Sequence, residues 1–92
     1  MTDQNYSFIL FVSGMSVKSS HAVENLKAIC DQHLKNKFKL QIIDITKEKE
    51  KAAEHQIFAI PTLIKIRPLP SRTIIGDLSQ TEKVLKILEI NE

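Results

Sequence analysis

The sequence predicts one α/β domain spanning residues 1–92, with the element order βαβαββα and a mixed four-stranded sheet. A chain of 92 residues suits a single small core and is too short for a lobed enzyme with a deep cleft. Short β-branched runs alternate with longer segments whose apolar residues recur at three- and four-residue steps. All three prolines fall within residues 61–70, where they divide the last third into short extended pieces.

The first half of the chain is typical of a right-handed βαβ unit. Residues 6–12 are apolar and aromatic enough for a strand that is covered on both faces. Residues 18–35 carry one apolar stripe at helical spacing, preceded by serines that can cap the helix. Residues 40–45 form the second strand, parallel to the first because a helix separates them. The stripe consists of Ala22, Val23, Leu26, Ile29, Cys30 and Leu34, and the candidate caps are Ser16, Ser19 and Ser20.

The second half predicts a short helix, two antiparallel strands and a final helix. Residues 46–54 hold strong helix formers but few apolar side chains, so we expect that helix to be loosely held. Pro61 starts an extended run at 62–66, and the following prolines turn the chain into a second run at 72–75. Ser79 and Glu82 have the spacing of a capping box, which predicts a last helix from there to residue 90.

Charge and composition exclude several classes of protein. A net charge of +2 is too small to argue for a nucleic-acid partner. The longest apolar stretch, residues 8–12, is too short to span a membrane, and no apolar signal segment opens the chain. The single cysteine excludes an internal disulfide and indicates a reducing compartment. We therefore expect a cytoplasmic protein with neither a nucleic-acid nor a membrane partner.

The residues whose side chains could take part in catalysis or metal binding are expected to have structural roles instead. Cys30 lies on the apolar stripe, where burial disfavours its thiolate. His21, His33 and His55 are too dispersed for a metal site, and the Cys30–His33 pair lacks a second pair of ligands. Gly14 is the only glycine of its turn, which therefore lacks the pattern of a phosphate-binding loop. We expect no catalytic residue, no metal and no cofactor.

Two backbone features remain in the last third of the chain. Gly76 permits a positive φ, and Asp77 is placed to form a turn into the last helix. Pro61 has two interpretations. A cis bond before it would free the Ile60 backbone to pair with an extended ligand, whereas a trans proline would start an edge strand.

The Ile60–Pro61–Thr62 segment, at the head of a strand after two βα units, resembles the proline turn of thioredoxin-like domains. Such domains usually carry a reactive cysteine at the first strand-to-helix turn. Here residues 12–20 contain serines and no thiol. The resemblance implies a thioredoxin-like scaffold used for something other than redox chemistry. The alternative is a relative of thioredoxin- or glutathione-type oxidoreductases that has lost its redox cysteine, and a further alternative is a sensor-like module of a kinase.

A more specific resemblance covers residues 6–90. The stretch Ile74-Ile75-Gly76-Asp77-Leu78-Ser79, with the proline-rich segment before it and residues 82–85 after it, resembles the KaiB family. The resemblance implies a non-enzymatic adaptor that docks on the first ATPase lobe of a KaiC-like, RecA-type hexamer and modulates circadian or stress signalling. It also implies a histidine kinase or other regulator as a further partner, and a homodimer or homotetramer as the assembly.

The same resemblance implies which residues carry the function. The partner-binding set is His21, Gln41, Gln56, Arg72 and Lys83, and the fold-defining set is Gly14, Pro61, Gly76 and Asp77. Members of this family also occupy a second, ground-state βαββααβ fold that assembles as a tetramer. This chain has Ile87 where clock members carry a glycine, and a glycine-free helix favours the thioredoxin-like state.

Overall fold

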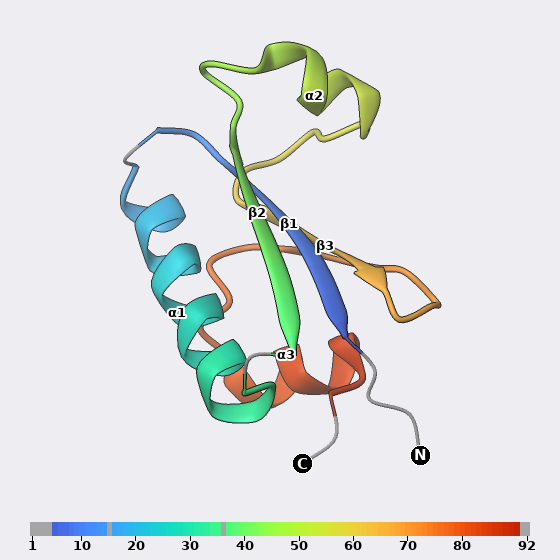
Figure 1. Cartoon of the computed structure of the whole chain (residues 1–92). Helices are drawn as coiled ribbons and strands as arrows, with labels where there is room; N and C mark the ends of the chain where they lie inside the picture. Colours follow the sequence, from blue (N-terminus) through green and yellow to red (C-terminus); the bar gives the residue numbers. More distant parts are fainter. Residues whose placement is uncertain (1–4, 15, 36, 91–92) are drawn as a thin grey trace.

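The computed structural model describes residues 5–14, 16–35 and 37–90, and it has the predicted element order (Figure 1). Four strands form one mixed sheet in the order β2-β1-β3-β4. β1 is parallel to β2 and antiparallel to β3, and β3 is antiparallel to β4. The strands are β1 (Tyr6–Val12), β2 (Phe38–Asp44), β3 (Thr62–Arg67) and β4 (Arg72–Ile75), and the helices are α1 (Val17–His33), α2 (Lys49–Glu54) and α3 (Thr81–Leu88).

β1 is a central strand, and its side chains supply the cores on both faces of the sheet. Phe8, Leu10 and Val12 belong to one hydrophobic cluster. Ile9 and Phe11 belong to another on the opposite face. All five side chains are buried, as the prediction of a strand covered on both faces requires.

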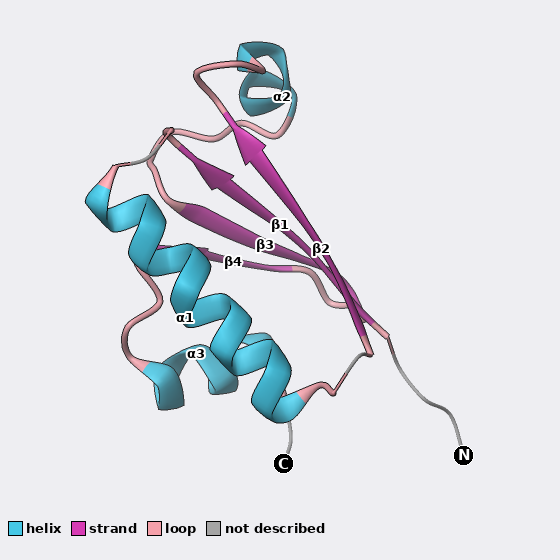
Figure 2. Ribbon diagram, turned by 60° about the vertical axis from the view of Figure 1, so that its left-hand side comes forward, coloured by secondary structure: helices cyan, strands magenta, loops and turns pink. Residues whose placement is uncertain are grey.

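One face of the sheet is closed by two helices. α1 and α3 lie together on the same side of the strands (Figure 2). The stripe of α1 buries Ala22, Leu26, Ile29 and Cys30 against this face, as its spacing predicts. Val84 and Leu88 of α3 complete the cluster, so most of the buried apolar residues lie on this side of the sheet.

The opposite face is much less covered. α2 has no buried residue and lies beyond the ends of β1 and β2 in both views (Figures 1 and 2). Among the described residues, the cluster on this face has Ile9, Phe11 and Ile43 as its buried members, with partly buried isoleucines around them. The expectation of a short and loosely held second helix is therefore confirmed.

Several predicted boundaries differ from the structure. α2 begins at Lys49 rather than at residue 46, because Thr46 bonds to the carboxylate of Asp44 through both its N–H and its hydroxyl. β2 begins two residues earlier than expected, and α1 ends at His33. α3 ends at Leu88, since Glu89 has a left-handed backbone with φ 59°.

The capping-box prediction is wrong. Gln80, not Ser79, is the N-cap residue of α3, and no side chain caps that helix. The N–H of Ser79 instead donates to Asp77 Oδ1 at 3.1 Å, so Asp77 forms the turn that was expected of it.

Pro61 follows a cis peptide bond, as do Pro68 and Pro70. The alternative of a trans proline at the start of an edge strand is therefore wrong. The bond is cis, and β3 is an internal strand that lies between β1 and β4. Within the described residues, no helix is long and apolar enough to cross a lipid bilayer.

Candidate functional site

The turn between β1 and α1 uses its serines as structural hydrogen-bonding groups. Ser16 is the N-cap of α1, and its Oγ accepts from the Ser19 N–H at 3.3 Å. Ser19 is fully buried, and its own Oγ accepts from the Ser13 N–H at 3.1 Å. Neither hydroxyl is paired with a basic group that could activate it as a nucleophile.

Asp44 joins this turn to the end of β2. Its Oδ1 accepts from the Gly14 N–H at 3.0 Å, the Thr46 N–H at 3.0 Å and the Thr46 hydroxyl at 2.7 Å. The hydroxyl bond, followed by the two backbone bonds, lowers the pKa of Asp44 because all three favour the ionised carboxylate. Gly14 adopts φ 53°, a conformation that glycine enters without strain. The carboxylate therefore fixes two loops at one end of the sheet.

Cys30 is unsuited to thiol chemistry. Its side chain is fully buried within the cluster beneath α1. Burial, with a smaller contribution from the Asp31 carboxylate, raises the pKa of the Cys30 thiol to about 12. The prediction of a structural cysteine is confirmed.

The KaiB-like stretch forms a rigid corner between β4 and α3. Gly76 adopts φ 129°, and its N–H donates to the Pro61 carbonyl at 3.0 Å. Asn25 Nδ2 on α1 donates to the Asp77 carbonyl at 2.8 Å, which ties the loop to the helix. Hydrogen bonds from the Ser79 side chain and N–H lower the pKa of the Asp77 carboxyl group. Two hydrogen bonds thus tie loop 76–79 to β3 and α1, and a third lies within the loop.

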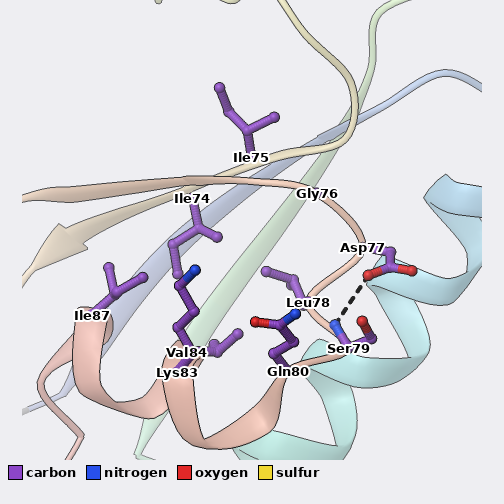
Figure 3. Close-up of a pocket in the computed structure, with 10 residues that line it drawn as sticks. All are labelled: Ile74, Ile75, Gly76, Asp77, Leu78, Ser79, Gln80, Lys83, Val84 and Ile87. Atoms are coloured by element: carbon purple, nitrogen blue, oxygen red, sulfur yellow. Dashed lines mark hydrogen bonds between the residues drawn. The ribbon is translucent and has the colours of Figure 1, made fainter.

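A shallow pocket of about 250 Å³ lies between this loop and α3 (Figure 3). Its apolar lining includes Ile74 and Val84, and Lys83 extends along its rim beside Ile74. Ile75 projects from the other side of β4, away from α3 (Figure 3). The pocket has one cationic side chain at its mouth and no arrangement of paired acids and bases.

A cluster of polar contacts fastens the C-terminal end of α3 to the sheet. Lys65 is fully buried, and its Nζ donates to the Leu88 carbonyl at 3.1 Å. The Tyr6 hydroxyl donates to the Glu89 carbonyl at 3.0 Å, and Arg72 Nη2 lies 3.0 Å from Glu89 Oε2. Burial lowers the pKa of Lys65. No local pattern of residues predicts this cluster, because its members are up to 83 residues apart.

Three of the five predicted partner-binding residues belong to α1, β4 and α3. His21 is exposed on α1. Lys83 lines the corner pocket with Asp77. Arg72 begins β4 and is half-exposed in its ion pair with Glu89. Of the three, Lys83 lines the corner pocket, whereas Arg72 lies at the other end of β4, beside Glu89 at the end of α3.

The other two residues lie elsewhere. Gln56 follows α2 and lines a groove of about 270 Å³ on the less covered face of the sheet. Gln41 is on β2, at the opposite edge of the sheet from β4. The five residues do not form one contiguous site.

The same groove contains a residue that the sequence analysis missed. Phe58 is 92% exposed, and Ile75 across the groove is 66% exposed. An aromatic side chain normally removes its large apolar surface from water, so this exposure marks a surface available for contact. No periodicity surrounds Phe58, and the sequence therefore offered no signal that it faces solvent.

Within the part of the chain that the structure describes, no three histidine, cysteine, aspartate or glutamate residues come together as a metal site. The described residues instead offer charged side chains such as Lys83 and exposed apolar side chains such as Phe58 and Ile75.

Comparisons with known proteins agree with this description. The family model described as the KaiB domain matches residues 9–90. The circadian clock protein KaiB3 of Synechocystis sp. is 43% identical over 81 residues, covering 88% of this chain and 79% of that protein. The circadian clock oscillator protein KaiB of Prochlorococcus marinus subsp. pastoris is 42% identical over 87 residues, covering 95% of this chain and 81% of that protein.

Solved structures show the same fold in more distant proteins. The N-terminal domain of SasA from Synechococcus elongatus superimposes with a TM-score of 0.75 at 22% identity, over 97% of this chain and 88% of that one. Mitochondrial thioredoxin 3 of Saccharomyces cerevisiae superimposes with a TM-score of 0.73 at 18% identity, over 96% of this chain and 82% of that one. The thioredoxin-like architecture is common to all three, and the sequence match places this chain in the KaiB family.

Proposed function

We propose that this chain is a cytoplasmic, non-enzymatic adaptor of the KaiB type, which docks on a KaiC-like ATPase and modulates circadian or stress signalling. The observation that carries the proposal is the KaiB-domain match over residues 9–90. The relatives are named as clock proteins and not as enzymes. The buried thiol of Cys30 and the serine-capped first turn support the same conclusion, since thiol exchange needs an accessible thiolate. By analogy, the docked chain recruits or displaces further regulators, of which a histidine kinase is one class.

The proposed docking surface is the β4–α3 corner together with the exposed side of α1. Lys83 supplies a positive charge at the corner, His21 is exposed on α1, and Arg72 lies at the start of β4. Hydrogen bonds from Asn25 to the Asp77 carbonyl and from the Gly76 N–H to the Pro61 carbonyl hold the loop between β4 and α3. A rigid surface loses little conformational entropy on binding, which favours affinity. Charges at the rim of an interface act mainly on the association rate and on its salt dependence.

The proposal is tested by measuring how the purified chain binds to a KaiC-like ATPase. Surface plasmon resonance gives the association and dissociation rates at low and high salt. We expect Arg72→Glu to slow association about tenfold at low salt and much less at high salt, because rim charges are screened. Lys83→Glu alters the same rim while leaving the Arg72–Glu89 ion pair in place. Lys39→Glu on β2 makes the same charge change at the far edge of the sheet and serves as the matched control.

The outcomes separate clearly. Slower association of the Arg72 and Lys83 variants, with normal association of the Lys39 variant, supports the corner as the docking surface. If all three variants associate at the rate of the wild type at both salt concentrations, Arg72 and Lys83 are not part of the interface. Absence of any binding by the wild-type chain contradicts the adaptor function.

A further inference from the structure

We propose that the outer edge of β4 binds an extended segment of a partner protein whose side chains alternate between apolar and acidic, adding a strand to the sheet beside β4. The inference goes beyond docking on an ATPase, because it uses the backbone of β4 and the face of the sheet opposite α1. It stands on three observations: the hydrogen-bonding register of β4, the groove beneath Phe58, and the charge of Lys83.

The register determines which backbone groups of β4 face outward. Gly76 donates its N–H to the Pro61 carbonyl, so these two directly opposed residues form a hydrogen-bonded pair. In an antiparallel ladder such pairs alternate with non-hydrogen-bonded ones. Thr73, opposite Ile64, and Ile75, opposite Thr62, therefore direct their N–H and C=O groups away from β3. Among the described residues no strand pairs with that edge, which leaves it a template for an added strand.

The apolar contacts come from the groove on the less covered face of the sheet, opposite α1 and α3, which is called the open face below. Ile75 and Thr73 form one wall of this groove of about 270 Å³, with Ile64 of the neighbouring strand beside them. Phe58 lines it from the loop after α2 and is 92% exposed. A strand added to β4 points every second side chain to this face. Those side chains must be apolar if they are to remove Phe58 and Ile75 from water.

The intervening side chains of the added strand meet a cationic surface. They point to the α3 side of β4, where Lys83 lies along the rim of the corner pocket beside Ile74 (Figure 3). Asp77, the acidic residue in the lining of that pocket, accepts the Ser79 N–H through Oδ1. Arg72 is already paired with Glu89. The ammonium group of Lys83 therefore favours glutamate or aspartate at the intervening positions.

The other edge of the sheet lacks this combination. The side chains of β2 that share the open face toward its start are Lys39 and Gln41, which are exposed and polar. A lysine on an edge strand discourages pairing with another chain. On the groove side, β4 presents Thr73 and Ile75 and no charge. The binding edge is therefore β4.

The test uses a blocked seven-residue peptide that alternates glutamate and valine, titrated into the ¹⁵N-labelled chain. We expect amide shift changes and slowed hydrogen exchange at Thr73 and Ile75, whose N–H groups face outward. A second peptide, with lysine in place of glutamate, should bind about tenfold more weakly because it meets Lys83 with like charge.

Three variants resolve the contributions of side chain, charge and backbone. Ile75→Lys should weaken binding of the glutamate–valine peptide about tenfold, since it places a charge in the groove. Lys83→Gln should weaken it about threefold and remove its salt dependence. Thr73→Pro removes an outward N–H and no bond to β3, so the fold should persist while binding is lost. A thermal melt of each variant confirms that it is folded.

The matched control is Ile42→Lys on β2, at a side chain 42% exposed. This variant should bind the peptide as the wild type does. His21→Glu should also bind the peptide normally, because His21 belongs to the proposed ATPase-docking surface and not to the β4 groove. Shift changes on β2 instead of β4, or no binding at millimolar peptide, would overturn the proposal. Slowed exchange at Thr73 and Ile75 that rises with protein concentration before peptide is added would also overturn it, since the occupant would then be a second copy of the chain.

Discussion

The two faces of the sheet differ in how they are closed, although β1 supplies apolar side chains to both. On one face α1 and α3 bury a large cluster that includes Leu10, Leu26 and Leu88. On the other, α2 buries nothing, and the small cluster around Phe11 is only partly covered. The closed face therefore holds most of the buried apolar side chains. The open side, with the β4 edge beside it, leaves backbone and apolar groups available to other molecules.

The largest expected effect is on the closed face. Leu26→Ala removes a fully buried side chain, and we expect the free energy of unfolding to fall by about 2–5 kcal/mol. Ile57→Ala, its counterpart on the open side, removes a partly buried side chain and should cost less than about 1.5 kcal/mol. Urea denaturation followed by circular dichroism measures both values. Equal losses would show that the two faces contribute alike.

A smaller effect concerns the loops where β1 and β2 end. Hydrogen bonds lower the pKa of Asp44 in the folded chain, so its contribution to stability is complete above its ordinary pKa of about 3.9. That contribution is lost as the pH falls toward the folded-state pKa. Asp44→Asn should therefore be less stable than the wild type at pH 7 and should lose less stability on acidification. Denaturant midpoints at pH 7, 5, 4 and 3 make the comparison, and identical pH profiles for the two proteins would contradict it.

The smallest expected effect is the redox activity of Cys30. The thiol is fully buried and its pKa is raised to about 12, so few thiolates form and none is accessible. Insulin reduction with dithiothreitol should therefore proceed at the rate of the blank. Cys30→Ala is the control. Catalysis that disappears in this variant would support the oxidoreductase alternative.

The alternating and helical patterns predicted the fold well, because they depend on local burial. The spacing of Leu26, Ile29 and Cys30 identified α1, and Gly76 has the positive φ that its motif required. The failed capping box has a local cause, since Asp77 takes the N–H of Ser79. The helix-forming residues predicted that α2 exists, but they could not predict where it lies relative to the sheet.

The site was less predictable than the fold. Arg72 and Lys83 were predicted through a family resemblance, and the structure places Lys83 in the corner pocket and Arg72 at the start of β4, paired with Glu89. The burial of Lys65 depends on the Leu88 carbonyl, and the exposure of Phe58 depends on the position of α2. Such features depend on tertiary contacts, and no local pattern of residues encodes them.

The contrast between the two faces depends on α3, which closes one face of the sheet as a helix. Backbone chemical shifts of residues 81–88 in the isolated chain test it most directly, because the alternative βαββααβ arrangement would place strand in this region. Glycine is absent from α3, and Lys65 holds the Leu88 carbonyl at its end. We expect helical shifts throughout residues 81–88. Strand-like shifts for residues 82–88 in the unmodified protein would contradict it.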